Sequence, residues 1–297
     1  MLVVLQLAVA AGLLAWRAGD DAPQRAASTQ RVTPAARTHR FDATRAMRLV
    51  ALQLSAGTRP AGSPQLRRMA VRLKALLGAA HFEDVAGADP GHALRNIVAE
   101  IPGRQPAIVL GAHYDTEYHP TGFVGANDAA AAVATVIEVA RALRATQRPA
   151  DAPAIRFVLF DGEEEPAPTD DFYRDALRGS KAYVTAHRGA TRAMVLLDYI
   201  GNRGVQLPRE ATSDAELWAK VRAAAAHVGV ASVFPDADEV GITDDHAPFL
   251  RAGVPAVDLI DWSYAYRDTA RDTYDKLAAP SVDAVGETIV QLLRTWR

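Results

Sequence analysis

Short apolar runs alternate with amphipathic segments along most of the chain. The runs have the length of strands at 96–101, 107–115, 155–160, 193–200 and 256–260. Apolar residues recur at helical spacing over 41–55, 65–78, about 128–145, 179–187, 213–228 and 281–296. Because strands that alternate with helices are typical of α/β domains, the pattern predicts a mixed, mostly parallel central sheet flanked by helices.

The N-terminal segment has a different pattern from the rest. Residues 2–16 are apolar except for Gln6, which is short for a membrane span and suits the apolar part of a signal peptide. We expect residues 1–38 to be a signal peptide or membrane anchor with a polar tether. The alternative is an ordinary helix docked on the domain. Residues 39–297 are then one catalytic domain of an exported protein that is periplasmic, secreted or membrane-anchored.

Composition excludes several classes of function. The 297 residues are 49% hydrophobic, which is enough for a sizeable core, and the formal net charge is −2 with no run rich in Lys or Arg. We therefore expect no nucleic-acid partner. The chain has no cysteine, so disulfides, thiolate zinc sites and cysteine nucleophiles are excluded.

Acidic residues and histidines gather where the predicted strands end. The run FVLFDGEEE at 157–165 passes from four apolar residues into Asp, Gly and three Glu. Similar positions hold His113, Asp115, Asp128, Asp198 and the sequence DDH at 244–246. Each alone also fits a solvated turn, and Asp128 fits a plain helix cap. Because ligands bind beyond the carboxyl ends of strands, the set together predicts a hydrolase-type metal site of carboxylates and imidazoles.

The wording and order of longer motifs resemble a known family from about Phe41 to the C-terminus. These motifs are FDATRAM, GTRPAGSP, LRNIVAEIPG, IVLGAHYDT, FVGANDAAAAVATVIEVARAL, FVLFDGEEE, LRGSKAYV, LLDYIGN, TDDHAPFLRAGVPAVDLI and DTYDKL. The chain resembles the M28 zinc peptidase family and, within it, the glutaminyl-peptide cyclotransferases, or glutaminyl cyclases. The resemblance implies the mixed sheet of zinc aminopeptidases, one or two Zn²⁺ ions, and peptide or protein N-termini as substrates.

The resemblance also implies two metal positions. One would be held by His113, Asp128 and Asp198. The other would be held by Asp128, Glu164 and a late histidine, and in cyclases this second position is the one normally filled.

The remaining roles follow from the same resemblance. Glu163 corresponds to the general acid/base. Asp198 and Asp245 correspond to an acidic network that accompanies it, whereas Glu165 has no family role and is expected at the surface.

One departure from the family pattern lies near the C-terminus. In the segment YRDTARDTYDKL at 266–277, Asp268 stands where the last zinc ligand is usually His, and Arg267 stands where an aromatic residue is common. Three carboxylates on one ion shift preference toward harder divalent ions. Three outcomes remain open: a metal site with Asp268 as ligand, use of the His113, Asp128 and Asp198 position, or a degenerate site.

The choice between a cyclase and an aminopeptidase also stays open. The sequence AAAAVA after GAND and the long segment 164–180 favour a cyclase, whereas Arg267 in place of an aromatic residue argues against one. Cyclase is the preferred interpretation. The alternatives are an M28 aminopeptidase that hydrolyses N-terminal residues and a non-catalytic peptide-binding relative.

Overall fold

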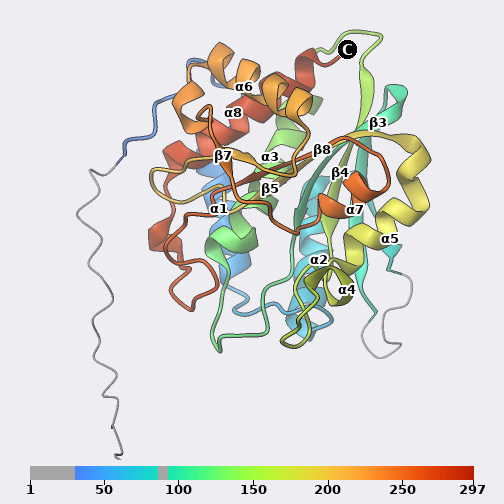
Figure 1. Cartoon of the computed structure of the whole chain (residues 1–297), viewed down its shortest axis with the longest axis vertical. Helices are drawn as coiled ribbons and strands as arrows, with labels where there is room; N and C mark the ends of the chain where they lie inside the picture. Colours follow the sequence, from blue (N-terminus) through green and yellow to red (C-terminus); the bar gives the residue numbers. More distant parts are fainter. Residues whose placement is uncertain (1–30, 86–92) are drawn as a thin grey trace, which may run out of the picture. The chain divides into compact units, whose positions relative to one another are not determined.

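A six-stranded mixed sheet forms the centre of the protein in a computed structural model that describes residues 31–85 and 93–297 (Figure 1). Its strands are β1 (Ala80–Asp84), β2 (Arg95–Ile101), β3 (Arg104–His113), β4 (Pro153–Phe160), β5 (Thr191–Asp198) and β8 (Ala256–Ile260). The order across the sheet is β1-β2-β4-β3-β5-β8. β2 is antiparallel to β1 and β4, whereas β4, β3, β5 and β8 are parallel. Short strands β6 (Arg209–Glu210) and β7 (Asp238–Glu239) pair separately.

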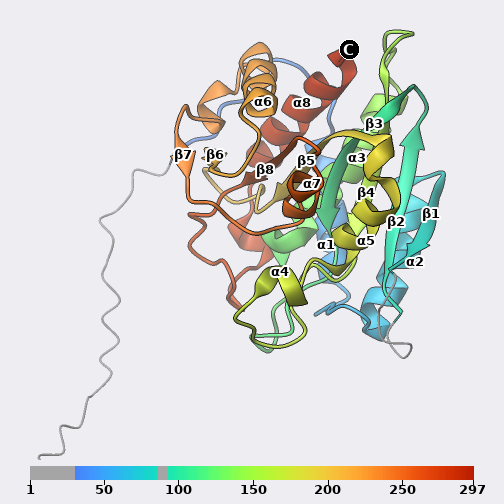
Figure 2. The ribbon, with the colours of Figure 1, turned by 45° about the vertical axis from the view of Figure 1, so that its right-hand side comes forward.

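Helices cover both faces of this sheet (Figures 1 and 2). The α-helices are α1 (Ala43–Leu54), α2 (Pro64–Leu77), α3 (Ala132–Arg144), α4 (Phe172–Asp175), α5 (Arg178–His187), α6 (Ala215–Val228), α7 (Ala247–Arg251) and α8 (Ala279–Thr295). Shorter turns are the π-helical η1 (Ala126–Ala131) and the 3₁₀ turns η2 (Arg188–Ala190), η3 (Ala231–Val233) and η4 (Tyr274–Lys276). α1, α3, α6 and α8 pack together on one face, whereas α5 and α7 contact each other on the opposite face.

Alternation along the strands explains the two covered faces. In β4, Phe157 and Leu159 belong to the core cluster that includes α3 and α8, whereas Val158 and Phe160 belong to the cluster that includes Tyr183 and Phe249. Successive strand side chains point to opposite faces, so a strand covered on both sides is apolar throughout. This is why the strands appear in the sequence as continuous apolar runs.

The predicted fold class and the main elements are confirmed. The predicted helix at 128–145 is η1 followed by α3, because the chain turns irregularly at Asp128 and Ala129 before α3 begins. β1, β6, β7, α4 and α7 were not predicted, because each is five residues or shorter.

The prediction for residues 2–16 lies outside the described residues, so the expected export remains a prediction. Val32–Arg297 form one compact unit. Within the described part of the chain, no helix has both the length and the apolar character to cross a membrane.

Candidate metal centre and active-site cavity

A cavity of about 500 Å³ opens beyond the carboxyl ends of β3, β4 and β5. Its wall contains eight carboxylates and one histidine: Glu117, Asp128, Glu163, Glu164, Glu165, Asp198, Asp244, Asp268 and His113. No Lys or Arg is among the described residues that line it. Phe172, Trp262, Ile242 and Ile260 add apolar surface. A site this acidic suits a cation or shared protons, because neighbouring carboxylates cannot all stay ionised without compensation.

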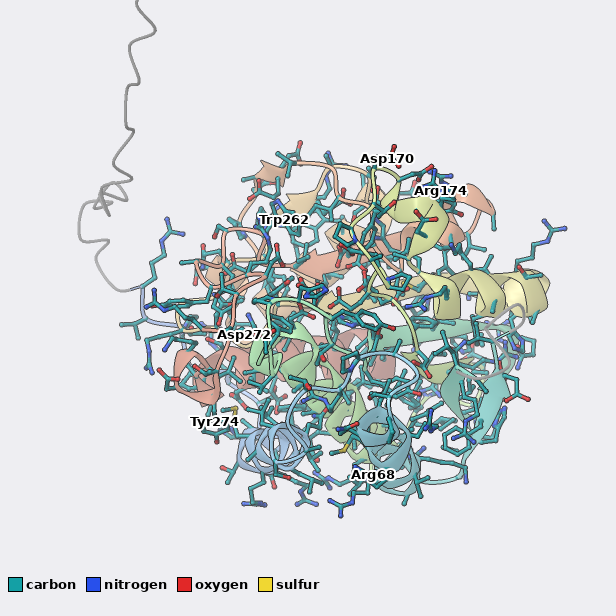
Figure 3. All side chains as sticks on the ribbon, turned by 90° about the horizontal axis from the view of Figure 1, so that it is seen from below. Arg68, Asp170, Arg174, Trp262, Asp272 and Tyr274 are labelled. Carbon is teal, nitrogen blue, oxygen red and sulfur yellow. The ribbon has the colours of Figure 1, made fainter. Side chains whose placement is uncertain are left out.

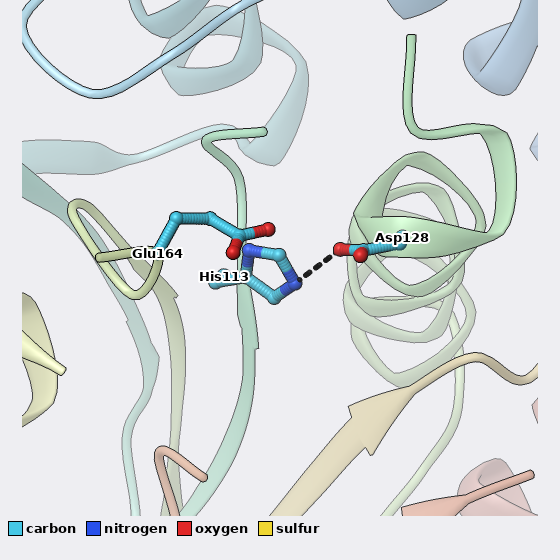
Figure 4. Close-up of side chains that lie close together, drawn as sticks. All are labelled: His113, Asp128 and Glu164. Carbon is cyan, nitrogen blue, oxygen red and sulfur yellow. Dashed lines mark ion pairs between the residues drawn. The ribbon is translucent and has the colours of Figure 1, made fainter. Parts of the chain in front are cut away.

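His113 ends β3 and lies at the centre of the acidic cluster. Its Nε2 is 2.9 Å from Asp128 Oδ1 and 3.7 Å from Asp198 Oδ1, and its Nδ1 is 3.7 Å from Asp115 Oδ1. Burial favours the neutral ring, yet hydrogen bonding to Asp115, Asp128 and Asp198 raises the pKa of His113 well above its ordinary value. Figure 4 shows this imidazole between Asp128 and Glu164.

Asp128 is positioned by an irregular turn rather than by a helix cap. Gly125 begins the turn with φ of +56°, and a Cβ at this position would lie 1.8 Å from the Asp128 carbonyl oxygen, so only glycine fits. The backbone N–H groups of Asn127 and Asp128 donate to the buried Asp272 carboxylate. The hydroxyl of Tyr199 donates to Asp128 Oδ2 at 2.6 Å. The plain-cap interpretation of Asp128 is therefore wrong, because its side chain faces the cavity.

The two central glutamates follow β4 and are held through their backbone. Asp115 accepts hydrogen bonds from the N–H groups of Glu163 and Glu164, both at 3.2 Å. Burial raises the pKa of both carboxyls well above the usual value, and nearby carboxylates add to the effect. A buried carboxyl that holds its proton more tightly than usual suits general acid/base work.

Asp198 and the DDH segment complete the acidic wall. Asp198 ends β5, and burial raises its pKa to about 8. Asp244 lines the cavity, whereas Asp245 is fully buried outside the lining residues. The structure therefore places the neighbouring Asp244 where Asp245 was expected, because the turn before α7 directs the first aspartate toward the cavity.

Asp268 lies at the cavity but not with the expected partners. The Tyr199 hydroxyl bridges it to Asp128, with 2.8 Å to Asp268 Oδ1. Oxygen atoms of Asp128 and Asp268 lie within 4.8 Å of one another and of Glu117, rather than in one group with Glu164. Arg267 Nε donates to Asp268 Oδ2 at 3.1 Å, so one oxygen of this carboxylate is held in an ion pair.

One residue on the cavity rim differs from expectation. Glu165 was expected at the surface but lines the cavity. Trp262 lines it too, and the guanidinium of Arg267 stacks 3.7 Å from its ring centroid. Figure 3 labels Trp262 together with Asp170 and Arg174 of the segment 164–180, whose Phe172 contributes to the same wall.

Three contributors were missed in the sequence. Glu117 lies two residues after Asp115 in a loop, and burial together with Asp128 and Asp268 raises its pKa to about 8. Tyr199 follows the strand-end Asp198 directly. Arg59 is buried and donates to the carbonyl oxygen of Gly57 at 2.8 Å. None of the three carried a signal in the sequence, because a charged or polar residue in a turn or after a strand is usually exposed and its burial is evident only in the structure.

The donor set of the buried group fits a metal ion. Ligand atoms of His113, Asp128 and Glu164 lie within 4.8 Å of one another, and all three residues are buried. His113 Nδ1 has no hydrogen-bond partner within the described chain, and Asp128 Oδ1 has only the contact with His113 Nε2 at 2.9 Å. One imidazole and two carboxylates match a three-ligand catalytic zinc site with an open fourth position.

Comparison with known proteins decides the family. The model of peptidase family M28 matches residues 96–293, about two thirds of the chain. The chain belongs to peptidase family M28. The mouse glutaminyl-peptide cyclotransferase-like protein is 30% identical over 230 residues, which cover 68% of this chain and 60% of that protein. A Gloydius blomhoffii glutaminyl-peptide cyclotransferase is 26% identical and is covered over 63% of its length, so the M28 chain spans less than two thirds of these relatives.

The solved structure of an Acidobacteriales bacterium glutaminyl cyclase superimposes with a TM-score of 0.77. It is 28% identical and covers 92% of this M28 chain and 98% of its own chain. The expected resemblance to M28 proteins of the glutaminyl cyclase type is thus confirmed.

Proposed function

We propose that this M28 protein is a glutaminyl-peptide cyclotransferase, which converts an N-terminal glutaminyl residue to pyroglutamate and releases ammonia. The observation that carries the proposal is the arrangement of Glu163, Glu164, His113, Asp128 and Asp198 around one cavity. The similarity to a glutaminyl cyclase over nearly the whole chain supports it.

The cavity suits a small polar side chain with a free amine. Its volume of about 500 Å³ is in the range of small-molecule sites. The acidic wall attracts a substrate N-terminus, which is a cation in solution, while Phe172 and Trp262 provide apolar surface for the methylenes of the glutaminyl side chain. The acidic wall and the apolar surface together would hold the α-amine near the γ-carboxamide of the same residue. The main requirement of an intramolecular attack is that these two groups are correctly oriented toward each other.

Glu163 is the proton carrier of the proposed reaction. Once the ammonium group of the N-terminus has given one proton to solvent, the neutral α-amine nitrogen bonds to the γ-carboxamide carbon, and the ionised Glu163 carboxylate accepts the second proton that this nitrogen loses. Glu163 then donates this proton to the departing nitrogen as the carbon–nitrogen bond of the amide breaks, so that ammonia leaves. Burial raises the pKa of Glu163 above its usual value, which brings it closer to that of the groups with which it exchanges the proton.

His113, Asp128 and Glu164 would hold the metal ion in this scheme. A divalent ion bound there would polarise the γ-carbonyl as a Lewis acid. The presence of an imidazole in this group favours Zn²⁺, whereas the oxygen-only group of Glu117, Asp128 and Asp268 suits a harder ion.

Ammonia release tests the proposal. Purified full-length protein loaded with Zn²⁺ is incubated with a peptide that begins with Gln, and ammonia is measured by a coupled enzyme assay. Ammonia from this peptide, with none from the same peptide acetylated at its N-terminus, is the expected result. Release of a chromogenic amine from an aminoacyl substrate, without ammonia from the glutaminyl peptide, would contradict the proposal and indicate an aminopeptidase.

A further inference from the structure

A second cluster of metal-type ligands lies behind the cavity wall and shares no residue with the group around His113. Asp244 and His246 precede α7, and Asp258 lies in β8. One ligand atom from each of the three lies within 4.8 Å of the others. Asp244 is 5% exposed and the other two are fully buried. Buried carboxylates in such a group require a compensating cation, a proton or hydrogen-bond donors.

Hydrogen bonds fix which nitrogen of His246 carries a proton. The hydroxyl of Thr212 donates its one proton to Glu210 Oε2 at 2.9 Å. Its 2.9 Å contact with His246 Nε2 therefore needs the imidazole as donor. Glu210 Oε2 is also only 3.3 Å from this nitrogen. Nε2 thus bears hydrogen and faces a carboxylate.

Glu210 is itself held as an anion. The backbone N–H groups of Thr212 and Ile242 donate to its Oε1, and the Ser213 hydroxyl donates to its Oε2. A metal-binding histidine usually donates its other ring N–H to an acceptor that orients the ring and leaves the ligating nitrogen free. Here the Thr212 hydroxyl, which is itself bound to Glu210, is that acceptor, and Glu210 Oε2 lies 3.3 Å from the same nitrogen.

On the other side of the His246 ring, a ring nitrogen faces carboxylate oxygens, and none of these atoms has a hydrogen-bond partner in the described structure. They are His246 Nδ1, both oxygens of Asp258 and Asp244 Oδ2, and all are buried. Nδ1 lies 3.7 Å from Asp258 Oδ2, which is too long for a hydrogen bond. Two ligands about 2.1 Å from one tetrahedral ion are separated by roughly 3.4 Å, so the observed spacing is close to that of two ligands of one metal.

We propose that Asp244, His246 and Asp258 bind a divalent cation of the zinc class in a structural site, with Glu210 orienting His246. Two carboxylates and a neutral imidazole balance the charge of a divalent ion. The three residues supply three of the four contacts of a structural zinc site, and the second Asp258 oxygen, which also lacks a hydrogen-bond partner, is available for the fourth. Asp244 belongs to this site and also lines the cavity, so the buried cation positions one wall of the proposed active site. The proposal stands on this cluster alone and does not depend on the reaction.

Metal content tests the proposal with matched variants. The full-length wild type, Asp258→Asn and Glu164→Gln are stripped with a chelator, reloaded with Zn²⁺, desalted and measured by plasma mass spectrometry. Asp258→Asn should hold one equivalent of zinc less than the wild type, and Glu164→Gln should keep that equivalent because it alters only the cavity group. Equal zinc in the wild type and in folded Asp258→Asn would overturn the proposal.

A crystallographic measurement keeps the test decisive if Asp258→Asn does not fold. Wild-type crystals soaked in Zn²⁺ should give an anomalous peak at the zinc edge about 2 Å from His246 Nδ1. Zinc density at the cavity group with none beside His246 would overturn the proposal and indicate that a proton, on the imidazole or shared by the two aspartates, neutralises the cluster.

Discussion

Two halves of the cavity differ in how deeply their charged side chains are buried. The strand-end half contains residues at or after the carboxyl ends of β3, β4 and β5, such as His113 and Asp128, whereas the loop half comes from the segment 262–268. The side chains of His113 and Asp128 are 3% and 4% exposed, whereas those of Arg267 and Asp268 are 28% and 49% exposed. Charges in the strand-end half are weakly screened, and the pKa values of His113 and Asp198 are raised. Charges in the loop half form an ion pair near solvent, where such pairs contribute little. The chemistry is therefore expected to depend on the strand ends, and the loop is expected to adjust binding.

The largest effect is expected from Glu163→Gln. The amide keeps the shape of the side chain but cannot carry the proton, so kcat/KM for cyclisation should fall by about 10²- to 10⁴-fold. Ammonia release measures the loss. Glu165→Gln is the matched control, since Glu165 lines the cavity without a role in proton transfer and its variant should retain most activity. Similar losses in both variants would contradict the assignment of Glu163.

Tyr199→Phe tests whether metal binding in the strand-end half depends on the hydroxyl that connects it to the loop half. Its hydroxyl bridges Asp128 in the buried half and Asp268 in the loop half. Removal of a hydrogen bond to a metal ligand typically costs about 10- to 100-fold in metal affinity, and we expect a loss of this size for Zn²⁺. Competition with a fluorescent chelator measures the affinity. Unchanged affinity would show that Asp128 does not depend on this bridge.

The pH dependence of stability should come from buried carboxyls and not from the loop. Burial raises the pKa of Asp161 to about 7, against about 3.9 in an unfolded chain. The folded state then keeps a proton that the unfolded state has lost, so the free energy of unfolding of metal-free protein should fall as pH rises from about 4 to 7.

Asp161→Asn should flatten this slope by up to about 1.4 kcal/mol per pH unit, as measured by urea unfolding at several pH values. An unchanged slope in Asp161→Asn would contradict the assignment of this pH dependence to the buried carboxyl.

The smallest effect is expected from Arg267→Ala. The substitution removes an exposed ion pair with Asp268 and a stacking contact with Trp262, so the free energy of unfolding should change by less than about 1 kcal/mol. The KM for a glutaminyl peptide should change more than kcat, because the change lies at the rim. Steady-state kinetics separates the two parameters, and a large fall in kcat alone would place the loop in the chemistry.

Strand-end residues were the part of the site that the sequence could predict. A buried strand has a fixed direction and alternation, so His113 and Asp198 are placed at the sheet edge by the apolar runs before them. The same reasoning predicted the α/β fold, because the hydrophobic periodicity of a long segment shows whether it is a helix or a strand. Very short elements such as β6 and α7 have too few residues for a pattern.

Loop geometry was the part that the sequence could not predict. The choice between Asp244 and Asp245 depends on the turn before α7, which no periodicity describes. Glu117 reaches the cavity from a loop, and Tyr199 bridges Asp128 and Asp268 only because β5 brings it beside the turn of η1. The pairing of Asp268 with Glu117 rather than with Glu164 follows from the same loop path.

The most direct test of the central claim is the mass of the product. A peptide that begins with Gln is incubated with zinc-loaded full-length protein, and the product is analysed by mass spectrometry. The account predicts a peptide of unchanged sequence that has lost one ammonia at its N-terminus, with the loss abolished in Glu163→Gln. Free glutamine together with a peptide shortened by one residue would contradict it.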